Sequence, residues 1–191
     1  MPAVVMTRFT EDSYTEEILN GKIHLMAKPS IIHADTTTSL TVMFHTFLKG
    51  RKCRMFTEVD VFLGEKDRVV PDLIVVCDPE KIKPNAIYGA PDLAIEVLSK
   101  STAKNDKGYK KELYAKHGVK EYWIVDTNNK MIEIYTLQDS QLKLQDTHAI
   151  LQDYEIDHDH PEKTAHIKSE FSPYIFPDMT VKLSEVFENI P

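Results

Sequence analysis

Two short apolar runs that each follow a Pro-Asp pair constrain the fold more than any other feature of this sequence. One run begins at Asp72 and the other begins at Asp92, and both are rich in aliphatic residues with almost no polar alternation. Runs of this kind are typical of interior strands that are buried on both faces. If the two strands pair as a hairpin, the start of the first lies beside the end of the second. That pairing brings Asp72 and Glu96 together at one edge of the sheet.

Glu96 is the more informative of these two acids, because it lies inside the apolar run LAIEVL. A carboxylate buried there is costly unless it is paired with a cation or bound to a metal. The sequence leaves open a plain salt bridge to a buried lysine. Asp72 also has a structural explanation, since Pro-Asp at a strand start is common turn chemistry and recurs at Asp92.

The lysine-rich segment that follows predicts a helix over residues 103–116, ended by Gly118. Lys110 precedes Leu113 and Tyr114 by three and four residues, which places it on the predicted buried face. Two carboxylates with a lysine nearby can hold a divalent cation against a phosphate. The alternative is a lysine whose stem is buried while its ammonium reaches water.

The rest of the chain alternates between helix and strand patterns and contains no convincing linker. We therefore expect one α/β domain over residues 1–191. The expected elements are a first helix that begins at Thr10 or Asp12 and carries Tyr14, Ile18 and Leu19, a strand at 22–26, a helix at 32–48, a strand at 53–63, strands at 121–125, 131–137 and 141–146, a loop at 151–170, an edge segment at 171–176 and a short final helix at 181–187.

The formal net charge of −7 argues against a generally basic nucleic-acid-binding surface. It leaves room for a local basic surface, and the alternative is a solvated lysine-rich helix face. The lysines that would form it are Lys100, Lys104, Lys107, Lys110, Lys111, Lys116 and Lys120.

The sequence has no pattern of a signal peptide and no run of about 18 apolar residues, so we expect no membrane span and a cytoplasmic protein. Cys53 and Cys77 lie far apart in strand-like runs, and we expect two buried thiols. A polar stretch could bind a transition metal, although a hydrophilic loop is the simpler interpretation. Its residues are Asp157, His158, Asp159, His160, Glu162 and His166.

Several motifs together resemble the Uma-type family of restriction endonucleases, in the PD-(D/E)XK nuclease superfamily. They are VPDLIVV, GAPDLAIEVLSKST, D-x-x-x-K over residues 106–110, and LYAKHGVKEYWIVD, with a further likeness upstream in EEILNGKIHLMAKPSIIHA. The likeness covers most of residues 14–137. It implies a restriction-endonuclease-like fold, with a central mixed β-sheet flanked by helices.

The resemblance also implies a metal-dependent phosphodiesterase site. Asp72 and Glu96 match the metal ligands, and Glu17 matches an acidic residue of the opening helix that can complete the site. Leu98 stands where the superfamily usually has its lysine, and Lys110 matches a lysine that has moved to the following helix. Mg²⁺ is the expected ion, with Mn²⁺ as a substitute, because the ligands are hard carboxylates.

Under this interpretation the chain is an endonuclease that hydrolyses nucleic-acid phosphodiester bonds through a metal-activated water. DNA is the expected substrate and a homodimer the expected state. His33 matches a histidine of the family to which we assign no role. The alternative is a non-catalytic nucleic-acid-binding or assembly module on the same fold, and a small-molecule phosphodiesterase is a third possibility.

Overall fold

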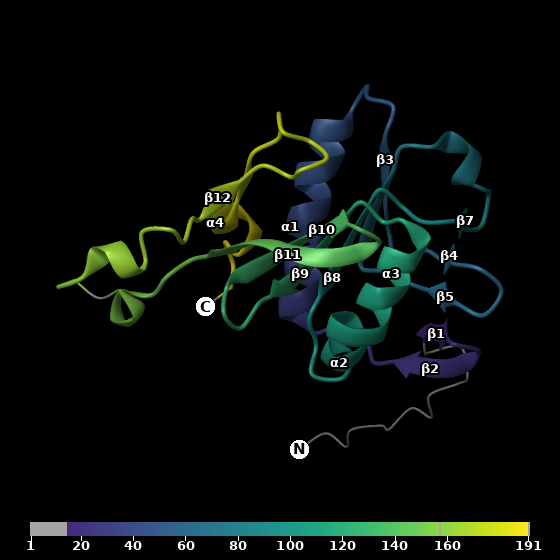
Figure 1. The fold of residues 1–191 in the computed structure, drawn as a ribbon, viewed down its shortest axis with the longest axis horizontal. Helices are drawn as coiled ribbons and strands as arrows, with labels where there is room; N and C mark the ends of the chain where they lie inside the picture. The colour runs from purple at the N-terminus through teal and green to yellow at the C-terminus, as the bar shows by residue number, and fades with distance from the viewer. Residues whose placement is uncertain (1–14, 157, 191) are drawn as a thin grey trace, which may run out of the picture.

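The computed structural model describes residues 15–156 and 158–190, and its centre is a six-stranded mixed sheet (Figure 1). The strand order is β11-β10-β9-β8-β6-β3, and β8 runs parallel to β9 while the other neighbours pair antiparallel. The expected central mixed sheet is thereby confirmed. Its strands are β3 (Arg54–Thr57), β6 (Leu73–Val76), β8 (Leu93–Val97), β9 (Glu121–Asp126), β10 (Met131–Gln138) and β11 (Gln141–Ala149).

The two Pro-Asp strands are β6 and β8, and they pair antiparallel at the middle of this sheet. Leu73 lies opposite Ile95, so Asp72 and Glu96 occupy the next facing positions. The predicted pairing is therefore confirmed. Every residue of both strands is buried, as expected for strands with covered faces.

Side chains of β6 alternate between two cores because successive residues of a strand point to opposite faces. Leu73 and Val75 belong to the core that contains α1 (Ile31–Leu48). Ile74 and Val76 belong to the core on the other face. This alternation decides on which face the neighbouring acidic residues emerge.

The helix α1 covers the first face and confirms the predicted helix at 32–48. It begins after Ser30, whose hydroxyl accepts a hydrogen bond from the backbone N–H of His33 at 3.2 Å. Leu40 and Phe44 are fully buried, and the ring of Phe44 packs 5.5 Å from that of Trp123 on β9.

The predicted helix at 103–116 covers the second face and is present, with a wider π-helical turn in its middle. The turn spans Asp106–Lys110, between α2 (Ala103–Asn105) and α3 (Lys111–His117). Gly118 ends the helix in the left-handed conformation, at φ +88°.

A second sheet of five strands lies beside the helix α3, in the order β2-β1-β5-β4-β7 (Figure 1). Its residues Leu19, Val61 and Val69 share one core with Leu113 of α3. Its strands are β1 (Thr15–Leu19), β2 (Lys22–Met26), β4 (Val61–Phe62), β5 (Arg68–Val69) and β7 (Ile87–Tyr88).

The predicted first helix is wrong over residues 15–19, which form β1 of a hairpin; Thr10, Asp12 and Tyr14 lie outside the described residues. Asn20 and Gly21 form the two-residue turn with φ values of +50° and +74°. An Asn-Gly pair between two strands is a strong hairpin signal, because both positions need positive φ. Glu17 and Leu19 are buried on one face, with the period of a strand.

The predicted strand at 53–63 is also wrong in its extent. The strands β3 and β4 belong to different sheets, and Glu58, between them, turns the chain with a φ of +50°. The apolar pattern continues through this bend because both short strands face covered cores.

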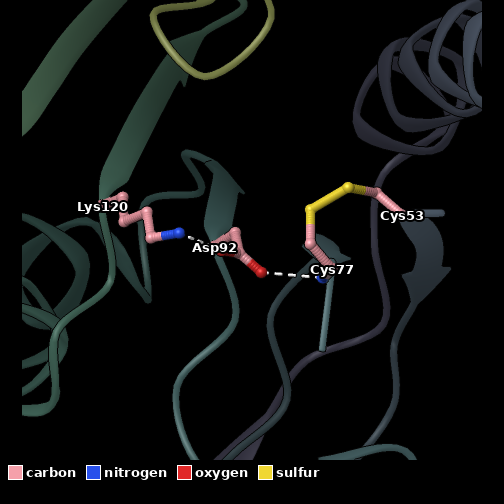
Figure 2. Close-up of a disulfide and its surroundings, with 4 residues drawn as sticks. All are labelled: Cys53, Cys77, Asp92 and Lys120. Carbon is pink, nitrogen blue, oxygen red and sulfur yellow. Dashed lines mark hydrogen bonds and ion pairs between the residues drawn. A yellow bond between two sulfur atoms is a disulfide. The ribbon is translucent and has the colours of Figure 1, made fainter. Parts of the chain in front are cut away.

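Cys53 and Cys77 form a disulfide, which corrects the expectation of two free thiols (Figure 2). Arg54 pairs with Val76 in the β3–β6 ladder, so the two cysteines face each other one position further along, with Cα atoms 3.9 Å apart. Only the register of two distant strands creates this contact, and cysteine spacing carries no trace of it.

The C-terminal part begins with the predicted loop at 151–170, which contains short 3₁₀ turns at Asp153–Glu155 and Pro161–Lys163 and extends away from the body (Figure 1). The chain then returns as β12 (Glu170–Phe171), β13 (Val181–Lys182) and α4 (Leu183–Val186). The predicted final helix is thus shorter than 181–187. This part packs into the core beside α1.

Candidate functional site

An open cavity of about 520 Å³ lies where β6 begins and β8 ends. Its walls come from the β2–α1 connection, the segment between β8 and α2, and the turn after β9. The acidic residues Glu58, Asp72, Glu96 and Asp106 line it, together with His33 and Lys110.

Asp72 is held by two contacts at the start of β6. Its Oδ2 accepts a hydrogen bond from the backbone N–H of Val97 at 2.7 Å and lies 3.3 Å from Nε2 of His33. The first contact joins the start of β6 to the end of β8. The carboxylate therefore has a fixed position on the cavity wall.

Glu96 is only 3% exposed and points to the face that carries the helix α3. Its Oε1 lies 2.6 Å from Nζ of Lys110 and accepts a hydrogen bond from the hydroxyl of Tyr114 at 2.7 Å. Burial raises the pKa of Glu96 well above its usual value, and the charges of Asp106 and other acids add to this against the attraction of Lys110.

Lys110 is the cation at the centre of this cluster, with a side chain that is 3% exposed. Its Nζ lies 2.6 Å from Glu96 Oε1, 2.9 Å from Glu17 Oε1 and 3.5 Å from Asp106 Oδ1. Burial alone lowers the pKa of Lys110, but these three carboxylates outweigh it and raise the pKa above its ordinary value. The ammonium is therefore charged.

Glu17 reaches the cluster from β1, and its Oε1 accepts hydrogen bonds from both the Val70 N–H at 2.8 Å and Lys110 at 2.9 Å. It does not lie among the residues that line the cavity. Its observed contacts make it an anchor for the ammonium of Lys110.

His33 projects from the first turn of α1 toward Asp72. Burial lowers the pKa of His33, but the hydrogen bond and the charge of Asp72 more than offset this, so the pKa is raised above 6.5. The histidine and the aspartate form a pair on the cavity wall.

The sequence did not identify two further members of the cluster, Asp106 and Tyr114. Both are buried and both lie four residues from Lys110 on the same helix, one on either side. That spacing was the available signal, because residues four apart share a helix face. The helical spacing predicts only that Tyr114 lies on the buried face.

Four of the seven lysines of the predicted local basic surface have contacts within the chain. Lys110 is buried, Lys107 pairs with Glu133, Lys111 lies over the ring of Tyr135, and Lys120 pairs with Asp92. Lys100 of the same set is exposed and lines the cavity, as does Lys28, which lies outside that set.

Residues 15–156 and 158–190 contain no group of three His, Cys, Asp or Glu side chains already gathered around a single point that could hold a metal ion. In the histidine-containing loop, His158 lies 3.3 Å from Asp153 and His160 lies 3.4 Å from Glu162, both at exposed positions. Asp157 is outside the described residues.

Comparison with solved structures defines the class of fold. The fold matches the crystal structure of a putative nuclease belonging to DUF820 from Anabaena variabilis, with a TM-score of 0.66 and 19% identity, over 91% of this chain and 89% of that one. The expected α/β nuclease-like fold is confirmed. The chain belongs to the Uma2 family, described as "Putative restriction endonuclease", whose model matches residues 6–162.

A curated relative is the uncharacterized protein slr1290 of Synechocystis, 29% identical over 126 residues. The match covers 64% of this chain and 66% of that protein, just under two thirds of its length. The part of the chain that the structure describes has no helix both long and apolar enough to cross a membrane.

Proposed function

We propose that this protein is a metal-dependent endonuclease that hydrolyses nucleic-acid phosphodiester bonds. The observation that carries the proposal is the meeting of Asp72 and Glu96 at facing strand positions, on the wall of one open cavity that Lys110 also lines. Membership of the Uma2 family supports the same activity.

The residues fit a hard divalent cation such as Mg²⁺, or Mn²⁺ in its place. Both described contacts of Glu96 fall on Oε1, which leaves Oε2 as the oxygen for a ligand in the cavity. Mg²⁺ typically uses one or two protein carboxylates and completes its shell with water and substrate phosphate, so Asp72 and Glu96 suffice. When bound, such an ion activates water and neutralises phosphate charge.

The remaining residues of the site have roles that follow from their contacts. Lys110 lines the cavity as a fixed positive charge that can stabilise the negative charge developing on a phosphate. Glu17 anchors its ammonium from outside the cavity. His33 and the Val97 N–H hold Asp72 in place.

Calorimetric titration of Mn²⁺ and Mg²⁺ tests the metal site without knowledge of the substrate. We expect saturable binding by the wild-type protein and a loss of at least tenfold in affinity for Asp72→Asn and for Glu96→Gln. The matched control is Asp92→Asn, which alters the other Pro-Asp aspartate at the opposite ends of the same two strands. Equal affinity in all four proteins would contradict the assignment of Asp72 and Glu96.

The substrate we propose is DNA, whose phosphates can approach the cavity between Lys28 and Lys100. Replacing both lysines by Gln should weaken DNA binding and lower the slope of log affinity against log salt by about 2. Lys107→Gln with Lys120→Gln is the control, since both of those lysines already pair with acids. A larger effect from the control pair would place the DNA elsewhere.

One observation favours the non-catalytic nucleic-acid-binding module as a second candidate. Each carboxylate of the site already has a cationic or potentially cationic partner in the chain, Lys110 for Glu96 and His33 for Asp72. Under this alternative, metal-free DNA binding would depend on Lys28 and Lys100, and Asp72→Asn would leave the affinity for DNA unchanged.

We also propose a homodimer, supported by the apolar side chains that the edge strand β2 exposes, Ile23 and Leu25. Light scattering on the purified protein gives its mass directly, and a monomer at every concentration would exclude the homodimer.

We further propose a cytoplasmic location, which the redox state of Cys53 and Cys77 in the cell would test. Disulfides are rare in reducing compartments, so the disulfide between these cysteines should not persist there. Trapping of thiols during cell lysis should then find both cysteines reduced.

A further inference from the structure

Asp106 is a carboxylate that the proposed chemistry has not used. It is 1% exposed, it lines the cavity, and its Oδ1 has no hydrogen-bond partner. Burial is the main cause that raises the pKa of Asp106, against the opposing effects of Lys110 and Thr102. A buried oxygen left without a donor requires an explanation, because burial removes the water that would otherwise bind it.

The cation nearest to this oxygen among the described contacts is the ammonium of Lys110, which has three N–H donors. Contacts of 2.6 Å to Glu96 and 2.9 Å to Glu17 account for two of them. The distance of 3.5 Å to Asp106 Oδ1 is too long for a good hydrogen bond. Asp106 therefore lies within a short movement of the ammonium without holding it.

The backbone around Asp106 favours a movement of side chains alone. The hydroxyl of Tyr122 donates a hydrogen bond to the backbone carbonyl of Asp106 at 3.1 Å, from a tyrosine that is fully buried on β9. Asp106 and Lys110 are the first and last residues of the π-helical turn. Both side chains thus extend from one fixed turn toward the same point.

We propose that Asp106 is a positioning residue for Lys110, which receives the ammonium when Glu96 releases it to bind another cation. After this exchange the ammonium is paired with Glu17 and Asp106 in place of Glu17 and Glu96. Lys110 then stays charged on the cavity wall while Glu96 is free to act as a ligand. The catalytic use of Lys110 and the cation that displaces it from Glu96 rest on the proposed function, whereas the ability of Asp106 to receive the ammonium does not.

A double-mutant cycle measured by urea unfolding without metal tests the exchange. It is run at alkaline pH, where carboxyl groups with a raised pKa are also ionised. In the otherwise wild-type protein, Asp106→Asn removes a weakly paired charge that other acids repel, so the unfolding constant should fall or rise less than threefold. In the Glu96→Gln background Asp106 is one of two carboxylates left to the ammonium, and the same change should raise the unfolding constant about tenfold.

Glu17→Gln provides a second background in case Glu96→Gln does not fold, because it also removes one present partner of the ammonium. The same increase is expected there. The control is Asp92→Asn, a buried aspartate paired with Cys77 and Lys120, whose effect should be equal in every background. An Asp106→Asn effect that is equally large in all backgrounds would overturn the exchange and make Asp106 an ordinary ion-pair partner.

The ammonium resonance of Lys110 in ¹H–¹⁵N spectra gives a readout that a purely structural carboxylate would not affect. Buried ammonium protons exchange slowly, so the signal should persist in Glu96→Gln at a shifted position. It should broaden or disappear when Asp106→Asn is added. A resonance indifferent to Asp106 in the Glu96→Gln background also contradicts the proposal. None of these outcomes depends on metal binding or on cleavage, which test the proposed function separately.

Discussion

The residues of this site show how burial turns ordinary side chains into a tightly coupled group. Glu96 and Lys110 are each only a few per cent exposed, and neither could keep its charge there alone. Glu17 adds a hydrogen bond to Lys110, and Tyr114 adds one to Glu96. A buried ion pair of this kind adds little stability, but removing one partner leaves an unpaired charge.

His33 gives a prediction that depends on pH. Its folded-state pKa is raised above 6.5, so its pairing with Asp72 stabilises the protein fully below pH 6.5, and this is lost as the pH rises through the folded-state pKa. His33→Gln should therefore cost about 1 kcal/mol in acid and less at higher pH. Urea unfolding of both proteins across a pH series measures this, and a difference that is constant with pH would contradict it.

The two Pro-Asp strands are braced in the same way at both ends. Asp72 accepts the N–H of Val97 at the end of β8, and Asp92 accepts the N–H of Cys77 at the end of β6, each at 2.7 Å. Identical dipeptides therefore serve the same structural purpose. The surroundings make the difference, since only Asp72 lines the cavity.

The two aspartates should separate stability from metal binding. Asp92→Ala leaves a backbone donor and Lys120 without their partner and should cost about 1–3 kcal/mol of unfolding free energy, with metal affinity unchanged. Asp72→Ala should cost less, because it also relieves repulsion with Glu96. Denaturant unfolding and calorimetry on both variants test this, and the reverse order of stability would refute it.

At the scale of the whole molecule, the site is assembled from parts of the chain that are far apart in sequence. The hairpin carrying Glu17 belongs to the second sheet, Asp72 and Glu96 to the central sheet, and Lys110 to the helix between them. The disulfide joins Cys53, just before β3, to Cys77, just after β6 (Figure 2), whereas Asp72 precedes β6 at its other end.

The double variant Cys53→Ser/Cys77→Ser should therefore lose stability without losing the site. The two cysteines are 24 residues apart, and opening a loop of that size costs about 3 kcal/mol. Thermal unfolding of the variant, compared with the oxidised wild-type protein, measures the loss. Metal affinity at low temperature should be unchanged, and a parallel loss of affinity would show that β6 transmits the change to Asp72.

The sequence by itself determined several local elements and one pairing. Continuous apolar runs after Asp72 and Asp92 specified interior strands, and their antiparallel pairing placed Asp72 opposite Glu96. Helical spacing assigned Lys110 to the buried face. These features follow from periodicities of two and of about four residues, which are local properties of the chain.

Tertiary structure alone decided which of these residues touch. Glu17 on β1 reaches the ammonium of Lys110 although 93 residues separate them. Cys53 meets Cys77 through the register of β3 and β6. Asp106 lies near Lys110 with an oxygen that no donor reaches. Contacts between distant segments depend on register and on how sheets and helices pack, and no local sequence pattern records either.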